Sequence, residues 1–139
     1  MKNTLGKQEK LKSRKQIDAL FKARKFVTHS PIRLFYQIQP DKPAGPGKPA
    51  VQAGFSCSKK FFKQANKRNR VKRLLRESYR LQKASLLDLC TQQHIHVSIF
   101  WLYGDKALPS QVEIHQKVAS LLQDLLDIIH KKIQKSASA

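Results

Sequence analysis

The chain has 139 residues, of which 40% are hydrophobic, and a formal net charge of +19 from 28 Lys and Arg against 9 Asp and Glu. The hydrophobic fraction is enough for one modest core and argues against a wholly disordered chain, while the charge predicts a polyanionic partner, with nucleic acid first and an acidic membrane surface second. No apolar run approaches the roughly 18 residues of a membrane-spanning helix, and the first twelve residues lack the apolar core of a signal peptide, so we expect a cytoplasmic protein.

The positive charge is confined to one part of the chain. Residues 1–83 carry 23 basic and 4 acidic side chains, whereas residues 84–139 carry 5 of each. A surplus that served only solubility would be spread along the whole sequence. The uneven distribution therefore indicates a localised binding surface.

The N-terminal region predicts a short helix after a tail. Residues 1–12 are polar and basic, and we expect them to be disordered, ahead of one domain at 13–134 and a second short tail at 135–139. Ser13 followed by Gln16 is typical of a capping box, and the apolar residues after it recur at helical spacing. These signals predict a helix over residues 14–24.

Two strand patterns follow, separated by a loop. Apolar and other residues alternate over residues 31–39, and residues 51–58 form a second strand-like run. Residues 40–50 between them are rich in Pro and Gly and cannot hold regular structure. We expect the two strands to pair with each other as a hairpin with a long loop.

Phe21 on the predicted helix and Phe35 on the first strand have two interpretations. Beside Arg33 they could line a groove for single-stranded RNA, in which each stacked base contributes ~1–3 kcal/mol. Alternatively both rings belong to the core, which the periodicity alone favours, because the helix and the strand must each bury one side.

The densest basic run extends from Lys59 to Lys83 and contains eleven Lys or Arg and one acid, Glu77. Apolar side chains recur in it at helical spacing, which predicts a helix over residues 65–89 with one side on a core: Val71, Leu74, Leu75, Ser78 and Leu81. The opposite side carries three cations spaced four residues apart, Arg68, Lys72 and Arg76. Two further arginines, Arg73 and Arg80, lie beside them.

A solvated charged face is the simplest interpretation of such a helix. Solvated helices, however, interleave Glu with Lys to form pairs four residues apart, whereas here like charges adjoin. Phosphates would remove that repulsion, and Arg supplies planar donors for phosphate oxygens. If the helix contacts about five to eight phosphates, binding should fall with salt at a log–log slope of roughly −4 to −6.

The last third of the chain predicts a strand and a helix. Residues 95–103 are strongly apolar, which is typical of a strand buried on both faces. Ser110 and Glu113 form a second capping box, followed by an amphipathic pattern that continues to about residue 132. The fold class expected from the whole order is α+β, a two-layer sandwich with helices covering a small sheet.

No catalytic arrangement is recognisable in the sequence, which lacks a GxGxxG, a phosphate loop, a GxSxG and paired carboxylates. His94 and His96 lie two apart on the predicted strand, as metal ligands sometimes do, but no further ligand is near and surface histidines are the simpler interpretation. Cys57 and Cys90 are far apart, and we expect both to be reduced and buried.

One part of the sequence carries a family signature. Residues 54–60 are GFSCSKK, and residues 68–77, after Ala65, are RNRVKRLLRE. This closely resembles the signature of the bacterial ribonuclease P protein subunit, whose specific RNxxKRxxR core is intact here. The resemblance covers most of the chain beyond the first ten residues.

The resemblance implies both a topology and a function. The implied order is α-β-β(-β)-α-β-α, with a small mixed sheet and a left-handed βαβ crossover, against the general right-handed preference. The implied function is that of the non-catalytic protein in a ribonucleoprotein endonuclease, a hydrolase whose RNA subunit, with Mg²⁺ bound mainly by the RNA, removes the 5′ leader from precursor tRNA. The protein would bind the RNA subunit 1:1, bind the leader and lower the Mg²⁺ requirement, with neither DNA nor a membrane as partner.

Two groups of residues are implied by the same resemblance. The residues expected to bind the RNA subunit are Lys59, Lys60, Arg68, Asn69, Lys72, Arg73 and Arg76. Those expected to line a leader-binding cleft between the first helix and the sheet are Ile17, Phe21, Arg33 and Phe35. Ile17 stands where the family often has an aromatic residue, so we expect an aliphatic contact there, and whether Phe35 or Tyr36 faces the cleft is left open.

Other classes of protein share parts of this pattern. A general RNA-binding module, such as a ribosomal protein or an RNA chaperone, would have the same charge but no preference for the ribonuclease P RNA over bulk RNA. A DNA-binding regulator would insert the basic helix in a major groove, but an apolar strand follows here in place of the partner helices. A protein nuclease would need more acids to hold metal ions.

Overall fold

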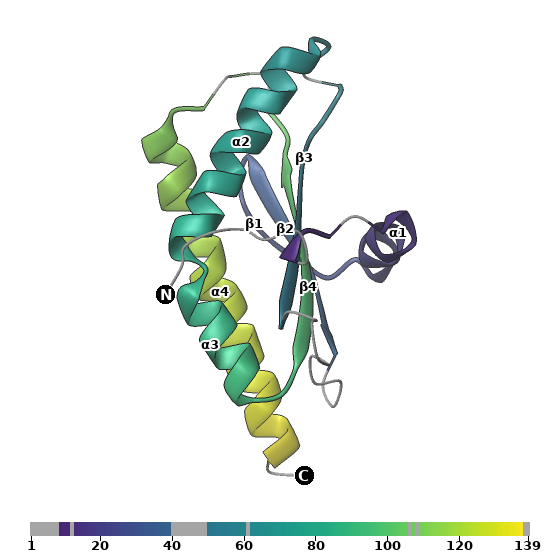
Figure 1. The fold of residues 1–139 in the computed structure, drawn as a ribbon, viewed down its shortest axis with the longest axis vertical. Coiled ribbons are helices and arrows are strands. Elements are labelled where there is room, and N and C mark those ends of the chain that lie inside the picture. The colour runs from purple at the N-terminus through teal and green to yellow at the C-terminus, as the bar shows by residue number, and fades with distance from the viewer. Residues whose placement is uncertain are drawn as a thin grey trace.

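The computed structural model describes residues 9–11, 13–39, 50–60, 62–105, 107 and 109–137. Its elements, in chain order, are α1 (Arg14–Ala23), β1 (Phe26–His29), β2 (Ile32–Gln39), β3 (Val51–Cys57), α2 (Ala65–Gln82), α3 (Ala84–Gln92), β4 (His96–Tyr103) and α4 (Gln111–Ala137) (Figure 1). The α+β class is confirmed, and the optional third strand before the basic helix is present as β1. The predicted loop at residues 40–50 lies outside the described residues, apart from Ala50.

The four strands form one mixed sheet in the order β1-β2-β4-β3. β4 pairs antiparallel with β2 and parallel with β3, so it lies between the two strands expected to form a hairpin. The hairpin prediction is therefore wrong, and burial explains why. Six of the eight residues of β4 are buried, and a strand that is apolar on both faces is stabilised most in the interior of a sheet.

Both predicted capping serines are confirmed. Ser13 Oγ accepts a hydrogen bond from the N–H of Gln16 at 3.4 Å, and Ser110 Oγ accepts one from the N–H of Glu113 at 3.2 Å. These bonds satisfy amide donors that have no partner within the first turn of a helix. α4 continues to Ala137, so it includes three of the five residues expected to form a C-terminal tail.

The basic helix is shorter than the predicted range of 65–89, because a break at Lys83 separates α2 from α3. The side chain of Lys83 is only 4% exposed, and its Nζ donates to a carboxylate oxygen of Glu9 at 2.7 Å. Leu81, which its spacing assigned to the apolar side, is 47% exposed, and the buried position is taken by Tyr79.

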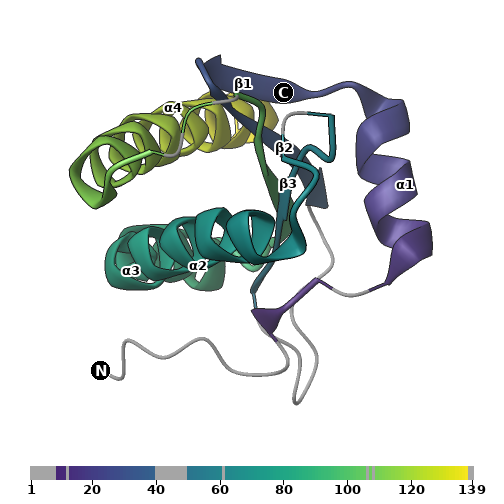
Figure 2. The same ribbon diagram turned by 90° about the horizontal axis from the view of Figure 1, so that it is seen from above.

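Helices cover both faces of the sheet (Figure 2). α2, α3 and α4 pack on one face, here called the α2 side, around a large core that includes Leu34, Leu75, Ile99, Trp101 and Leu121. α1 packs on the opposite face, here called the α1 side, over a smaller cluster: Leu11, Leu20, Phe35 and Phe100, with Ile17, Phe21 and Leu102 partly buried against it. The predicted two-layer sandwich thus has a partial third layer.

A short N-terminal segment lies along the free edge of β3. The N–H of Leu11 donates to the carbonyl of Ala53 at 2.9 Å, and the Leu11 side chain packs under α1, while Glu9 contacts Lys83 on the α2 side. Residues 9–11 therefore make defined contacts, although the sequence placed them in the expected tail at 1–12. The other residues of that tail lie outside the described ranges.

Candidate nucleic-acid interface

α2 separates an apolar inner side from a cationic outer side. Val71, Leu75 and Tyr79 pack on the sheet and thereby fix the orientation of the helix. The cations at the other positions form what we call the α2 surface: Lys67, Arg70, Lys72, Arg73 and Arg76, of which only Lys72 is half-buried. The helical spacing of the apolar residues therefore directs the basic residues outward, as predicted.

The described residues neutralise little of this charge. Among the described residues three ion pairs form, and only Arg80–Glu77, at 2.7 Å, involves a cation of α2. The first turn of α2 contains no acid, so the positive end of the helix dipole adds to the potential of the side chains. Arg73 and Arg76 are free of carboxylates in the described part of the chain, which leaves them able to meet phosphates.

Arg68 has a structural contact that its sequence position did not predict. Its guanidinium donates to the carbonyls of Phe62 at 2.6 Å and of Lys63 at 2.9 Å. Because the N-cap residue, Gln64, makes no side-chain capping bond, Arg68 holds the turn that leads into α2. The other residues expected at the RNA subunit, Lys59, Lys60 and Asn69, are exposed in this turn and the start of the helix.

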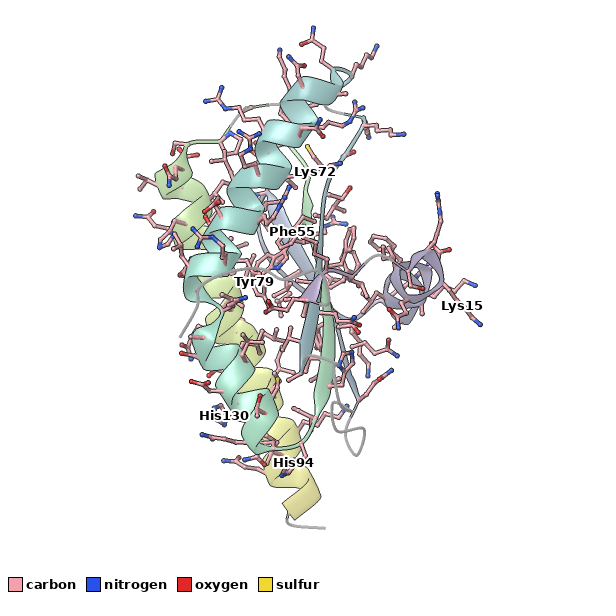
Figure 3. All side chains as sticks on the ribbon, viewed as in Figure 1. Lys15, Phe55, Lys72, Tyr79, His94 and His130 are labelled. Carbon is pink, nitrogen blue, oxygen red and sulfur yellow. The ribbon has the colours of Figure 1, made fainter. Side chains whose placement is uncertain are left out.

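A groove of about 230 Å³ lies between α2, β3 and the N-terminal segment. Its lining contains three cations and no carboxylate: Lys10, Lys72 and Arg76, with Leu11, Ala53, Gly54 and Phe55. Figure 3 shows Phe55 and Lys72 between α2 and the sheet, whereas Lys15 of α1 points outward on the opposite side. Lys10 was not among the predicted site residues, because the segment that carries it was expected to be disordered.

On the α1 side, the strand register aligns three phenylalanines across the sheet. Phe26 of β1 pairs with Phe35 of β2, Phe35 pairs with Phe100 of β4, and Phe100 pairs with Gly54 of β3. We call Phe26, Phe35 and Phe100 the aromatic row. Phe21 of α1 lies over it, with its ring centroid 4.7 Å from that of Phe35 and 5.3 Å from that of Phe100, edge-on in both cases.

Gly54 makes room for the last ring of the row. A Cβ atom at this position would lie 2.5 and 2.7 Å from two ring carbons of Phe100. Any side chain would therefore displace the ring. The glycine of the GFSCSKK motif is thus explained by packing on the α1 side, and not by a turn.

The residues expected to line the leader cleft are brought together, but with unequal exposure. Phe35 faces α1 and is only 7% exposed, whereas Tyr36 lies on the α2 side against the large core. Phe21 and Ile17 are half-buried at the edge of the smaller cluster. Of the two rings, Phe21 offers more free surface to a ligand.

Phe26 is an aromatic residue of this surface that the sequence did not single out. It lies between the predicted helix and the predicted strand, and it is 42% exposed. The Arg33 guanidinium carbon is 5.5 Å from the centroid of the Phe26 ring, a cation–π contact. Recognising Phe26 would have required the short strand β1 and its register with β2.

The strands that form the α1 side of the sheet carry no negative charge. None of the four strands contains an Asp or a Glu. Beside the aromatic row, Gln37, Ser98 and Gln52 occupy the next cross-strand row. Amide, hydroxyl and guanidinium groups next to aromatic faces are suited to single-stranded nucleic acid.

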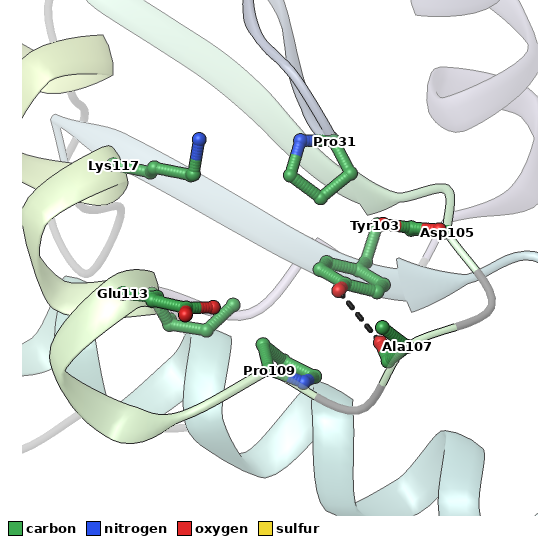
Figure 4. A pocket seen from close by; sticks show the side chains of 8 residues that line it. Pro31, Tyr103, Asp105, Ala107, Pro109, Glu113 and Lys117 are labelled. Atoms are coloured by element: carbon green, nitrogen blue, oxygen red, sulfur yellow. Dashed lines mark hydrogen bonds between the residues drawn. The ribbon is translucent and has the colours of Figure 1, made fainter.

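A second, smaller pocket of about 80 Å³ lies where β4 leads into α4 (Figure 4). The Tyr103 hydroxyl donates to the carbonyl of Ala107 at 2.8 Å, and Lys117 Nζ donates to the carbonyl of Ser30 at 2.5 Å. Burial, with a smaller effect of Asp105, raises the pKa of Tyr103 to about 12. The hydroxyl is therefore protonated at neutral pH and its contacts are structural.

The histidines and cysteines form no reactive group in the described residues. His94 is not on the strand as expected but in the preceding turn, with φ of 54°, and His96 is the first residue of β4. No three His, Cys, Asp or Glu side chains gather there in a way that could hold a metal ion. Cys57 and Cys90 are free and buried, as predicted, and burial raises the pKa of Cys90 to about 12. No helix of the described ranges is long and apolar enough to cross a membrane.

Comparison with known proteins relates the chain to one family. The model of the family "Ribonuclease P" matches residues 5–125. The ribonuclease P protein component of Chlorobium phaeobacteroides is 34% identical over 88% of this chain and 88% of its own length. That of Porphyromonas gingivalis is 36% identical over 76% of this chain and 74% of its own length.

The fold has a counterpart among solved structures. The structure of the Staphylococcus aureus RNase P protein superposes with a TM-score of 0.63, covering 84% of this chain and 94% of that chain, at 18% sequence identity. At that identity the likeness shows the fold alone, whereas the family model and the curated relatives extend over most of the sequence. The chain belongs to the ribonuclease P protein family.

Proposed function

We propose that this chain is the RNA-binding protein subunit of ribonuclease P and that it assists a catalytic RNA in removing the 5′ leader from precursor tRNA. Family membership supports the subunit role. The observation that carries the division of labour is the placement of two different surfaces on opposite faces of one sheet. In this proposal the α2 surface binds the RNA subunit in a 1:1 complex, and the α1 side binds the leader.

The α2 surface would act through charge. When the RNA subunit binds, its phosphates accept charge-assisted hydrogen bonds from the cations of the α2 surface, which removes the repulsion between those cations. Counterions of the RNA are released at the same time. By neutralising phosphates where two RNAs meet, the protein lowers the concentration of Mg²⁺ needed for cleavage. The Mg²⁺ ions that act in cleavage are, in this proposal, held mainly by the RNA, and the isolated protein does not cut RNA.

The α1 side would act through stacking and neutral donors. Phe21 offers part of a ring to an unpaired base, next to donors such as Arg33 and Gln37. Such a surface binds single-stranded RNA with little sequence preference, because every base has an aromatic face. Binding the leader favours precursor over mature tRNA, which lacks it.

The variant Arg73→Ala/Arg76→Ala tests the role of the α2 surface. Both side chains are exposed and make no ion pair in the described residues, so the fold should be retained, whereas Arg68 is left in place because it holds the turn. We expect RNA-subunit binding to weaken roughly 10- to 100-fold, because charge-assisted hydrogen bonds to phosphates are lost, and protein-dependent cleavage at limiting Mg²⁺ to fall accordingly.

The matched control removes the same charge elsewhere. Lys131→Ala/Lys132→Ala changes the last turns of α4, whose C-terminal end lies at the opposite end of the molecule from the start of α2 (Figure 1). It should bind the RNA subunit within about twofold of the unmodified protein. Normal cleavage by the α2 variant at limiting Mg²⁺, or equal binding of the RNA subunit and bulk RNA in competition, would contradict the proposal and favour a general RNA-binding module.

A further inference from the structure

Phe26 is an exposed aromatic residue at the outer end of the aromatic row. The described residues include three large hydrophobic side chains that are exposed, and Phe26 is the only aromatic one, at 42%. Its ring centroid is 5.3 Å from that of Phe35, with 45° between the planes. Phe35 is covered by Phe21, whereas Phe26 lies on the last strand of the sheet and keeps free ring surface.

The surroundings of Phe26 favour an anionic partner with flat, apolar parts. The Arg33 guanidinium is 5.5 Å from the ring centroid, and Arg24 and Lys25, which precede Phe26, are exposed. No strand of the sheet carries an acid. A hydrophobic partner protein would not need these cations, whereas a nucleotide uses both the ring and the positive charge.

The geometry also connects Phe26 with the surface already described. The register places Phe26 directly opposite Phe35, so its ring extends the aromatic row past the region that α1 covers. Arg33 and Thr28 follow on the same face, as the next cross-strand pair. A strand of RNA that leaves the region around Phe21 toward β1 would meet Phe26 and Arg33 together.

We propose that Phe26 and Arg33 form a binding site for one unpaired nucleobase of single-stranded RNA, with the base stacked on the ring and the guanidinium at its edge or backbone. This rests on the proposed function, in which the RNA at this face is the 5′ leader. The site therefore takes a leader nucleotide beyond those held near Phe21, and it makes binding depend on how far the leader extends.

Three substitutions separate stacking from simple burial. In the reconstituted holoenzyme, Phe26→Tyr keeps an aromatic face, Phe26→Leu keeps an apolar side chain of similar reach, and Phe26→Ala removes both. We expect Phe26→Leu and Phe26→Ala to weaken binding of precursor tRNA with a long leader roughly 5- to 10-fold, at the lower end of the loss known for one base–aromatic stack. Phe26→Tyr should bind within about twofold, and mature tRNA should bind all variants equally.

The same series distinguishes failure of this site from failure of the proposed function. If the unmodified protein does not stimulate cleavage by the RNA subunit, the proposed function fails, whatever the variants do. If stimulation is normal but Phe26→Leu binds long-leader precursor as well as Phe26→Tyr does, stacking on Phe26 is disproved. An equal loss for precursor and mature tRNA would also overturn the site.

A spectroscopic measurement checks the contact without activity. Trp101 is the single natural tryptophan and is fully buried, so Phe26→Trp adds one exposed reporter. Addition of a single-stranded oligoribonucleotide should quench its fluorescence, because a stacked base quenches indole emission, and Arg33→Gln in the same background should weaken the binding curve. Unchanged emission at concentrations of oligoribonucleotide that saturate the protein would contradict the proposal.

Discussion

The two faces of the sheet use opposite physical means for what we propose is the same class of ligand. The α2 side buries a large apolar core and turns only charge outward, through cations that make few ion pairs within the described residues. The α1 side carries a small cluster, leaves aromatic rings partly exposed, and has neutral donors around them. Electrostatic attraction to the α2 side is long-range and does not depend on nucleotide sequence. Stacking on the α1 side requires an unpaired, unstacked base.

In the proposed function, this difference lets one small protein bind the RNA subunit and the leader at separate surfaces. A folded RNA subunit presents closely spaced phosphates, which favour the α2 surface. A single-stranded leader presents unpaired bases, which favour the α1 side. The segment with Glu9 and Leu11 contacts both sides at the edge of β3 and so links the two surfaces.

The largest expected effect that separates the two sides is their response to salt. Binding of the RNA subunit should follow a log–log slope of roughly −4 to −6, so a fourfold increase in salt weakens it by a factor of several hundred or more. The preference for precursor over mature tRNA depends mainly on stacking and should show a slope less than half as steep. Filter-binding titrations over a range of KCl concentrations measure both, and equal slopes would contradict the comparison.

A substitution on the α1 side should have an intermediate effect. Gly54→Ala places a methyl group where the ring of Phe100 lies, 2.5 Å from its nearest carbon. We expect a loss of ~1–3 kcal/mol in the free energy of unfolding, because overpacking forces the ring to shift. Leader discrimination should fall as well, with RNA-subunit affinity largely kept.

Ser56→Ala is the control for that substitution, since Ser56 lies two residues further along the same face of β3. Its thermal midpoint should stay close to that of the unmodified protein. A Gly54→Ala protein with unchanged stability and leader binding would show that Phe100 is not held as the structure indicates.

The smallest expected effect concerns the core of the α2 side at alkaline pH. Burial raises the pKa values of Cys90 and Tyr103 to about 12, from ordinary values of 9.0 and 10.0. The folded state therefore holds these protons more tightly than the unfolded state. The resulting stability is fully present below pH 9 and is lost progressively as the pH rises toward 12.

Urea unfolding of the free protein between pH 8 and pH 11 measures this loss. Cys90→Ala should be less stable at pH 8, because it leaves a cavity, but its stability should decline less between pH 9 and pH 10. A decline identical to that of the unmodified protein would mean that Cys90 titrates normally.

Local signals in the sequence predicted most elements, but not how they meet. The capping serines Ser13 and Ser110 and the apolar spacing of α2 depend on neighbours within a few residues, and they were confirmed. The pairing of β3 with β4 depends on a contact across two helices, which no local pattern specifies.

The candidate site also contains some residues that local patterns predict and others that they do not. The cations of α2 could be predicted because helical spacing alone directs them outward. Arg68 could not be assigned to its turn, since the carbonyls it contacts are set by the three-dimensional path of residues 62 and 63. Phe26 and Phe100 become neighbours of Phe35 only through the strand register. The same register places Phe100 opposite Gly54.

The central claim is that opposite faces of the sheet contact different RNAs, and directed cleavage tests it most directly. An iron chelate attached to Asn66→Cys or to Lys22→Cys generates hydroxyl radicals on the α2 side or on α1. The native Cys57 and Cys90 are buried and have raised pKa values, which keeps them unmodified. In the holoenzyme bound to precursor tRNA, we predict cuts in the RNA subunit from Asn66→Cys, an exposed position in the first turn of α2 that is outside the set of binding cations, and in the leader from Lys22→Cys. Cuts in the same RNA from both positions, or an uncut RNA subunit with the chelate at Asn66→Cys, would contradict the account.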